Sequence, residues 1–265
     1  MSQRLLSRTN LVKAFKEPRK ASSILLHKVF APIGHQDYRR FVVLTRDRTG
    51  SNMLIQALNS HPNIAADYEI FGKLYGEAEE SILEGCFSKQ PFYVQAKGFK
   101  IFYYHPQDAE DSPVWDMLTA MENLHVIHLK RRNLLHVEVS SRVAYTTGIY
   151  GVRSEKEHAD YQKKLSPVQF SYDGLLRLFK QNRDWEMTGA DRFAGHAMIE
   201  VCYEDMAAQF DCEYRRVLAF LGIEYRPPRI DFKKQRTKHM RNQVENYDEL
   251  KARFAGTEWE SFFDD

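Results

Sequence analysis

The chain has 265 residues, of which 43% are hydrophobic and 28% are charged, and its formal net charge is only +2 at pH 7. These values are typical of a globular α/β protein with a real core, and they give no support to nucleic-acid binding through overall charge. The three cysteines form no CxxC pair and have no histidines at metal-ligand spacing, which predicts a reducing compartment and no structural zinc. No apolar run approaches the roughly 20 residues that a membrane span needs.

The first 40 residues are basic, with Glu17 and Asp37 as their only acids. Their apolar residues could form a weakly amphipathic helix on an anionic membrane surface, but the apolar face is short. We therefore favour a solvated arm that packs loosely on the domain. The expected organisation is a basic N-terminal arm over residues 1–40 and a single domain over 41–265, located in the cytoplasm, with a peripheral membrane contact through the arm left open.

The stretch Phe41–Ile64 organises the rest of the chain. An apolar run, Phe41–Leu44, stops at a polar turn, and apolar residues at helical spacing resume at Met53, which predicts strand, loop and helix. A glycine in the loop, the free first amides of the helix and the helix dipole together favour a bound phosphate. The plain alternative is an ordinary strand-to-helix turn with Ser51 or Asn52 as an N-cap. The polar turn contains Arg46, Arg48, Thr49, Gly50, Ser51 and Asn52.

The same loop is not a Walker A sequence, because no second glycine followed by Lys and Ser or Thr occurs in it. Kinase or NTPase chemistry is therefore disfavoured. Arg48 would instead add a full positive charge and a forked hydrogen-bond donor to the phosphate site.

Two charged residues stand in apolar surroundings further along. Glu69 lies in the stretch ADYEIFG, where a carboxylate can be a salt-bridge partner, an exposed charge or a general base. After a polar stretch of helical character over residues 76–92, Tyr93–His105 is rich in branched and aromatic residues and predicts a strand. Lys100 within it either extends to the surface or reaches an anionic ligand at the strand's carboxyl end.

A second candidate phosphate site follows a helix predicted over Trp115–Asn123. The strand predicted over His125–Arg131 runs directly into Arg132 and a helix that carries Ser140 two turns later. If that helix folds back along a ligand, the guanidinium and the hydroxyl can reach one phosphate. A basic surface cluster with a solvated serine is the alternative.

The remaining segments complete the predicted fold. Residues 146–167 are loop-like and are interpreted as a lid or an acceptor-side segment, and a helix starts at Tyr172. A strand over Ala197–Cys202 precedes a helix that ends at Gly222. The basic run Lys233–Arg241 is either a second phosphate clamp or a solvated face. Four strands interleaved with helices predict an α/β fold with a P-loop-like central parallel sheet flanked by helices on both faces.

Several of these motifs resemble those of a known family. TRDRTGSNML looks like the 5′-phosphosulfate loop of sulfotransferases that use 3′-phosphoadenylyl sulfate (PAPS), and the spacing from Arg132 to Ser140 is similar to their 3′-phosphate signature. VCYEDM followed by VLAFLGI resembles the segment whose tyrosine, here Tyr203, lies near the adenine. The whole arrangement, from about Phe41 to Phe263, looks most like the bacterial nodulation-type carbohydrate sulfotransferases.

The resemblance implies transfer of a sulfuryl group from PAPS to a hydroxyl acceptor, a carbohydrate or glycolipid, without a metal. It implies a catalytic set of Glu69 as base with Arg48 and Lys100. The base histidine of cytosolic family members has no clean match, and His105 is the alternative base. The implied donor-binding residues are Arg48, Thr49, Gly50, Ser51, Asn52, Arg132, Ser140, Tyr203 and Lys234.

Two other functions remain open at this point. One is a nucleotide-binding regulatory domain that has kept the fold without catalysis, and the other is a P-loop kinase-like phosphotransferase. The expected partner is a small hydroxyl-bearing acceptor and not a nucleic acid, and a homodimer is left open.

Overall fold

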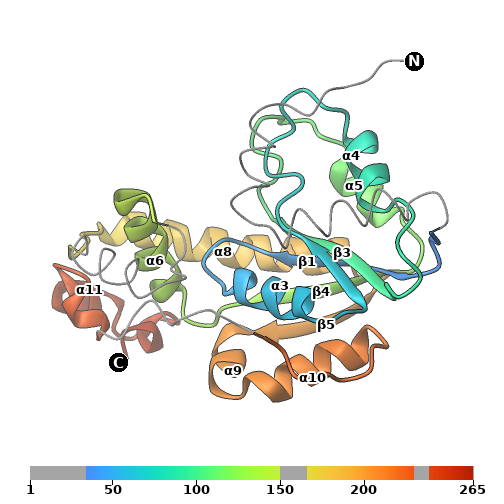
Figure 1. The fold of residues 1–265 in the computed structure, drawn as a ribbon. Coiled ribbons are helices and arrows are strands. Elements are labelled where there is room, and N and C mark those ends of the chain that lie inside the picture. Colours follow the sequence, from blue (N-terminus) through green and yellow to red (C-terminus); the bar gives the residue numbers. More distant parts are fainter. Residues whose placement is uncertain (1–33, 150–165, 230–238, 265) are drawn as a thin grey trace.

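The computed structural model describes residues 34–149, 166–229 and 239–264, so residues 1–33 of the predicted arm over 1–40 lie outside them. The described chain is built on a five-stranded sheet in the order β2-β3-β1-β4-β5, in which every pairing is parallel (Figure 1). The predicted central parallel sheet is therefore confirmed. The strands are β1 (Arg39–Thr45), β2 (Ile64–Asp67), β3 (Ala96–Phe102), β4 (Leu124–Lys130) and β5 (Ala197–Cys202).

The strand order places β1 at the centre, between β3 and β4. The chain first builds the β2–β3 side of the sheet and then crosses to the β4–β5 side, so the order reverses beside β1. In open α/β sheets such a reversal leaves a crevice at the carboxyl ends of the strands, where ligands bind. The loop after β1 lies at that edge.

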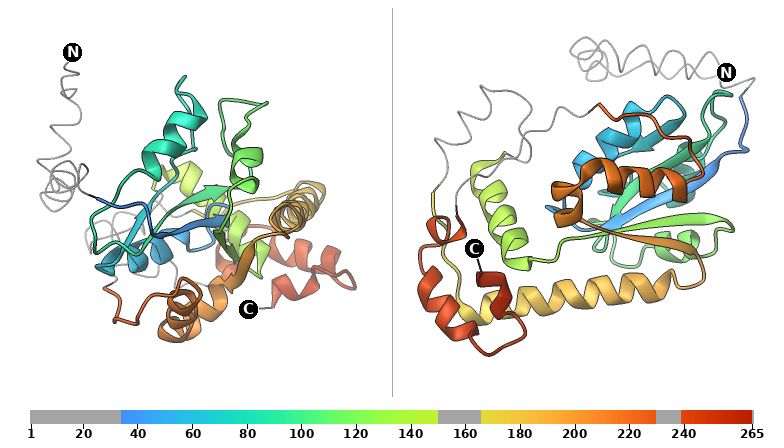
Figure 2. Two further views of the ribbon diagram at one scale, coloured as in Figure 1. Left: turned by 90° about the vertical axis from the view of Figure 1, so that its right-hand side faces the viewer. Right: turned by 90° about the horizontal axis from the view of Figure 1, so that it is seen from below.

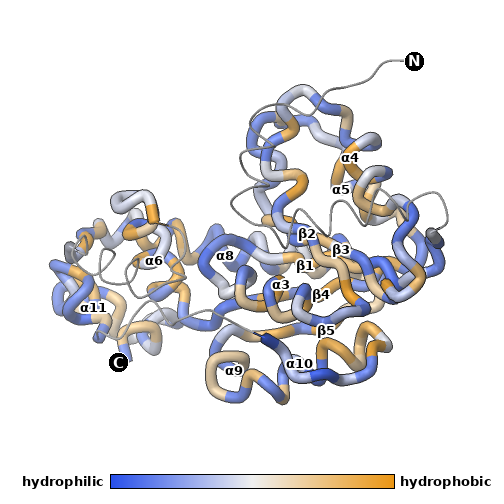
Figure 3. The backbone as a smooth tube through the Cα atoms, in the orientation of Figure 1, coloured by the Kyte–Doolittle hydropathy of each residue, from blue (hydrophilic) through white to orange (hydrophobic). Residues whose placement is uncertain are grey.

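Helices cover both faces of this sheet, as predicted. Alternate residues of β1 point to opposite faces: Phe41 and Val43 pack with α3 and α10, whereas Val42 and Leu44 pack with residues of α4 and α5. Figure 3 shows the strands as the most hydrophobic part of the backbone between more polar helices. The helices of the described chain are α3 (Ser51–Ser60), α4 (Glu79–Cys86), α5 (Val114–Thr119), α6 (Leu134–Thr147), α8 (Tyr172–Arg192), α9 (Tyr203–Ala208), α10 (Phe210–Phe220) and α11 (Tyr247–Phe254), with short 3-10 turns at Met240–Asn242 and Glu260–Phe263.

A third apolar cluster forms a side lobe, which we define as α6, the first half of α8, α11 and the turn Glu260–Phe263. Its centre is aromatic, with Phe179, Phe254 and Phe263 almost fully buried. Helix α8 has 21 residues and runs from this side lobe to the sheet (Figure 2). The lobe therefore holds α6 beside the carboxyl edge of the sheet.

Two secondary-structure predictions were wrong. Strand β2 was missed, because Ile64–Asp67 is a four-residue edge strand with two alanines and lacks a branched apolar run. The helix expected over residues 76–92 covers only Glu79–Cys86. Past it, Gln90 exchanges two backbone hydrogen bonds with His35, at 2.8 and 2.9 Å, so this segment follows the edge of the fold as extended chain.

Among the described residues, no helix is both long enough and apolar enough to cross a membrane.

Candidate active site

The loop between β1 and α3 has a backbone that favours an anion. Arg48 and Gly50 both lie in the left-handed region, with φ of 65° and 84°. A Cβ on Gly50 would stand 2.5 Å from Cδ2 of Tyr203, so only glycine fits there. Gly50 is also the N-cap of α3 without a side-chain cap bond. The alternative of Ser51 or Asn52 as the N-cap is therefore wrong, and the first amides of α3 have no intrahelical acceptor.

Hydroxyl groups lock this loop from inside. The Thr49 hydroxyl donates to the Arg46 carbonyl at 2.9 Å and lies 2.7 Å from the Thr45 hydroxyl, which itself donates to the Leu129 carbonyl on β4 at 2.6 Å. Thr49 was predicted to bind the donor nucleotide. Its hydroxyl is engaged within the loop, and its contact with the donor stays a prediction.

The two arginines of the loop have different surroundings. Arg46 is buried and donates to Glu138 on α6 at 2.6 Å and to Asn182 on α8, which anchors the end of β1 to both helices. Arg48 Nε donates to the Ser140 hydroxyl on α6 at 2.9 Å. The two predicted phosphate sites are therefore in direct contact, through residues that are 92 positions apart.

Lys100 links the loop to the candidate base. Its side chain is only 1% exposed, its Nζ lies 2.7 Å from Glu69 Oε1, and it also donates to the Asn52 side-chain carbonyl at the start of α3. Burial lowers the pKa of Lys100, the neighbouring Arg48 lowers it further, and the Glu69 carboxylate opposes both effects. Of the two sequence alternatives for Lys100, surface extension is wrong. A contact with an anionic ligand stays a prediction.

His105, the alternative base, lies near Lys100 and Glu69 but differs from Glu69 in its hydrogen bonding and its burial. Its Nδ1 accepts a hydrogen bond from the Phe102 amide at 3.3 Å, and burial lowers its pKa to about 4. His105 is therefore neutral near pH 7, and a group with so low a pKa is a poor proton acceptor there.

Arg132 and Tyr203 lie at the other end of the site. The Arg132 guanidinium forms a forked pair with the Asp205 carboxylate of α9, with Nη1 at 2.8 Å from Oδ1. Arg132 immediately precedes Asn133, the N-cap of the helix that carries Ser140, but its guanidinium contacts Asp205 of α9 and is largely exposed. The Glu204 carboxylate accepts from the Arg132 amide at 3.0 Å, which further ties α9 to the end of β4.

The sequence search missed Arg131. Its guanidinium lies over the Tyr203 ring, 4.3 Å from the centroid, and donates to the Arg48 carbonyl at 3.0 Å. Arg131 thereby joins Tyr203, the predicted adenine contact, to the loop between β1 and α3, the predicted phosphate site, which we call the phosphate loop. The only signal for it in the sequence was the pair of adjacent arginines, Arg131 and Arg132, at a strand end. That pair does not show which of the two contacts Tyr203.

Comparison with known proteins gives a relative for nearly the whole chain. Nodulation protein H of Rhizobium tropici is 27% identical over 239 residues, which cover 84% of this chain and 92% of that protein. Nodulation protein H of Rhizobium meliloti (strain 1021) is 26% identical over 239 residues, covering 84% and 94%. The chain resembles the nodulation-type sulfotransferases. No family model matches it.

Solved structures are more distant. A sulfotransferase from Alicyclobacillus acidocaldarius has a TM-score of 0.47 at 15% identity and covers 81% of this chain and 90% of its own. A mouse sulfotransferase complexed with PAP has a TM-score of 0.43 at 14% identity, with 87% and 88% covered.

Some predicted residues have no structural account, because they lie outside the described part of the chain. Lys234 and most of the predicted lid lie outside the described residues. Within the described part of the chain, no group of three or more His, Cys, Asp or Glu side chains gathers as a metal site would require. The metal-free mechanism itself stays a prediction.

Proposed function

We propose that the protein transfers a sulfuryl group from PAPS to the hydroxyl of a carbohydrate or glycolipid acceptor. The observation that carries this proposal is the contact chain from Glu69 through Lys100 to Asn52. It connects a half-buried carboxylate to the first turn of α3, where the loop favours an anion. A proton acceptor and a phosphate site are thus joined by one buried cation.

The chemistry assigned to these residues is an in-line transfer. Glu69 takes the proton of the acceptor hydroxyl while that oxygen bonds to sulfur, and the bond from sulfur to the 5′-phosphate oxygen breaks. The leaving phosphate gains negative charge. Lys100, Arg48 and the amides of Gly50, Ser51 and Asn52 stabilise that charge from a site that is already ordered.

Donor recognition is assigned to the residues on the α6 and α9 side. Arg132 and Ser140 hold the 3′-phosphate, and Tyr203, with Arg131 on its ring, contacts the adenine. A charge-assisted hydrogen bond contributes roughly 1.5 to 3 kcal/mol, so loss of the 3′-phosphate contacts should weaken binding more than tenfold. The Arg48 to Ser140 hydrogen bond supports this assignment because it brings the two phosphate sites within reach of one nucleotide.

Glu69 is the better candidate base than His105. The side chain of Glu69 is 33% exposed, so an acceptor can reach it, whereas His105 is 4% exposed and its pKa is about 4. The cytoplasmic location, a peripheral membrane contact through residues 1–40 and a homodimer stay predictions.

The test is thermal unfolding with adenosine 3′,5′-bisphosphate (PAP), AMP, ADP or ATP at matched excess, with and without Mg²⁺. A ligand at 100 times its Kd stabilises the fold by about 2.7 kcal/mol, which moves the melting temperature visibly. Selective stabilisation by PAP without Mg²⁺ is expected. An equal response to ATP, or a need for Mg²⁺, would contradict the 3′-phosphate site and favour the kinase-like alternative.

A further inference from the structure

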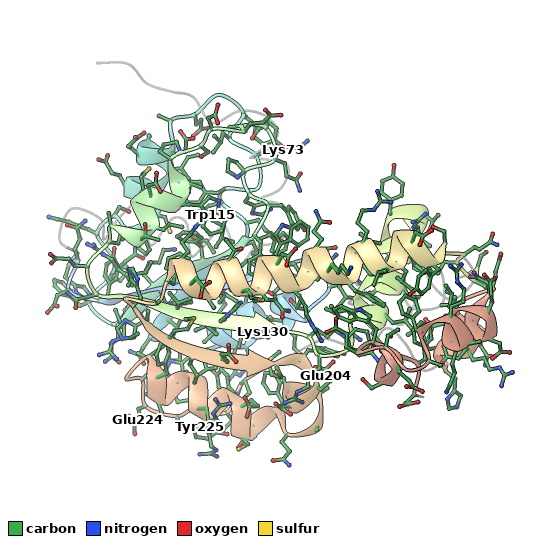
Figure 4. The ribbon with its side chains drawn as sticks, turned by 180° about the vertical axis from the view of Figure 1, so that it is seen from behind. Lys73, Trp115, Lys130, Glu204, Glu224 and Tyr225 are labelled. Carbon is green, nitrogen blue, oxygen red and sulfur yellow. The ribbon has the colours of Figure 1, made fainter. Side chains whose placement is uncertain are left out.

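A cavity of about 740 Å³ lies between the chain that follows β2 and helix α4. Glu69, Lys73 and Tyr75, all from the chain that follows β2, line it. Figure 4 shows Lys73 in the part of the molecule that contains α4 and Trp115 of α5. Because Glu69 contacts Lys100, which donates to Asn52, the cavity is connected to the loop between β1 and α3 through one carboxylate and one lysine.

The rim of the cavity is held in an unusual conformation. Tyr75 has φ of 53° and Gly76 has φ of 79°. Both oxygens of Asp108 accept backbone amides here, from Leu74 at 2.8 Å and from Tyr75 at 3.0 Å. A tyrosine in the left-handed region is rare and costs free energy, so its surroundings must impose it.

This conformation presents the Tyr75 ring to solvent, where 85% of the residue is exposed. The other polar side chains of the lining offer both hydrogen-bond donors and acceptors, since they include Lys73, Glu77 and Gln107. Ile70, Leu74 and Ile82 give the wall an apolar part. An aromatic ring beside mixed donors and acceptors suits a sugar, whose C–H face packs on the ring while its hydroxyls bond to the polar groups.

The charge around the cavity limits the kind of sugar. The lining contains Glu69, which is paired with Lys100, and Glu77, against Lys73. The carboxylate that an anionic acceptor would meet is therefore Glu77. An acceptor with carboxylate or sulfate groups would meet like charges there. The volume falls within the roughly 300–1,000 Å³ of pockets for drug-sized ligands, which is enough for a disaccharide.

We propose that this cavity is the acceptor subsite, and that it takes a neutral or amine-bearing saccharide, at least two rings long, stacked on Tyr75. The inference rests on the proposed function, because it places the acceptor hydroxyl at Glu69. It adds where the acceptor binds, which residue stacks on it and which charge it excludes.

The test uses PAP-saturated protein and ligand-observed NMR titration of four disaccharides: cellobiose, N,N′-diacetylchitobiose, chitobiose and cellobiouronic acid. Binding of at least one of the first three is expected, with the uronic acid at least about tenfold weaker than cellobiose. Tyr75→Ala should weaken binding about fivefold, the magnitude of a lost aromatic contact. Tyr145→Ala is the matched control, because Tyr145 is 82% exposed on α6 and does not line the cavity.

Glu77→Lys supplies the charge test and should bring the affinity for cellobiouronic acid to within about threefold of cellobiose. The proposal is overturned if none of the four sugars binds, or if both tyrosine variants lose the same amount of affinity. It is also overturned if the uronic acid binds wild-type protein as well as cellobiose does. A titration of the free protein with PAP, and the same disaccharide titrations without PAP, report separately on the proposed function. Protein that binds PAP but no disaccharide contradicts the cavity alone, whereas disaccharide binding through Tyr75 without PAP binding contradicts the sulfotransferase.

Discussion

Two carboxylate–lysine pairs connect β2 and the residues just after it to β3, and only one of them contacts the phosphate loop. Asp67 pairs with Lys97 at 2.5 Å, and Glu69 pairs with Lys100 at 2.7 Å. Lys100 also donates to Asn52, which belongs to α3. The Asp67 pair is therefore a natural control for the Glu69 pair.

We expect Glu69→Gln to lower turnover by roughly 10² to 10⁴-fold, the usual contribution of a general base, while PAP binds within about twofold of wild type. Asp67→Asn should leave turnover within a few-fold. The measurement is steady-state sulfation with PAPS, together with a PAP titration of each variant. Turnover of Glu69→Gln within about tenfold of wild type would remove Glu69 as the base.

The Arg132–Asp205 pair leads to a prediction on donor affinity. A 3′-phosphate that binds Arg132 must compete with the Asp205 carboxylate for the same guanidinium. An exposed pair of this kind is screened by solvent and contributes little, so Asp205→Asn should tighten PAP binding by no more than about fivefold. Arg132→Ala should weaken it more than tenfold.

Calorimetric titration of both variants with PAP and with AMP is the measurement. AMP lacks the 3′-phosphate and should bind the two variants and the wild type alike. If Asp205→Asn weakens PAP binding, Asp205 orients Arg132 and does not compete for it.

The residues that sequence reasoning found share a visible signal. Glu69 and Lys100 are charges within apolar stretches, and Arg48 stands in a loop that breaks a strand–helix pattern. Asp205 gave no such signal, because its contact with Arg132 joins segments 73 positions apart. For Thr49 the motif predicted a ligand contact, which stays a prediction, but it did not show that the hydroxyl donates to the Arg46 carbonyl of the same loop.

Two titratable groups, Glu186 on helix α8 and the buried His128 on β4, respond to pH in opposite directions. His128 is fully buried, its Nε2 lies 2.7 Å from the Tyr103 hydroxyl, and burial lowers its pKa to about 4. Unfolded His128 titrates near 6.5 and then binds a proton that the fold excludes, so stability falls as the pH drops from about 6.5 to 4. Burial raises the pKa of Glu186 to about 7, so the fold binds that proton more tightly and gains stability as the pH drops from about 7 to 4.5.

Glu186→Gln removes the opposing contribution. We expect the variant's free energy of unfolding to fall more steeply than the wild-type value between pH 6.5 and 4.8, by up to about 1.4 kcal/mol per pH unit. Urea unfolding at three pH values within that window measures the slope. His128→Gln should flatten it instead, and parallel slopes in all three proteins would contradict both assignments.

Periodicity predicted four of the five strands, including the edge strand β5, and failed at β2, the shortest strand. The strands at Phe41, Lys100 and His125 have branched or aromatic runs, and the helix after Asn133 ends at Gly148 with φ of 68°. Strand β2 is held by its neighbour β3 and by α3 instead of by its own composition. Such stabilisation by tertiary contacts cannot be read from a four-residue window.

The molecule has two parts that a bound nucleotide would connect. The sheet contributes the loop with Arg48, while α6, packed in the side lobe with α8 and α11, contributes Ser140. We expect PAP to slow amide hydrogen exchange in α6 and α11 as well as in the loop, because it adds contacts across this junction. AMP should slow exchange mainly in the loop.

Exchange followed by mass spectrometry, with both nucleotides at saturation, makes the comparison. Equal protection of α11 by PAP and AMP would mean that the 3′-phosphate does not engage the side lobe.

The internal hydrogen bonds of the loop also bear on how strongly any anion can bind. Thr45, Thr49 and the buried Arg46 fix the backbone that holds Arg48 at positive φ before a ligand arrives. The entropy of ordering the loop and the strain at Arg48 are then costs of folding and not of association. The loop is pre-organised for binding at a cost to the stability of the fold. Substitutions that let residue 48 leave the positive-φ region should therefore raise the melting temperature and weaken nucleotide binding.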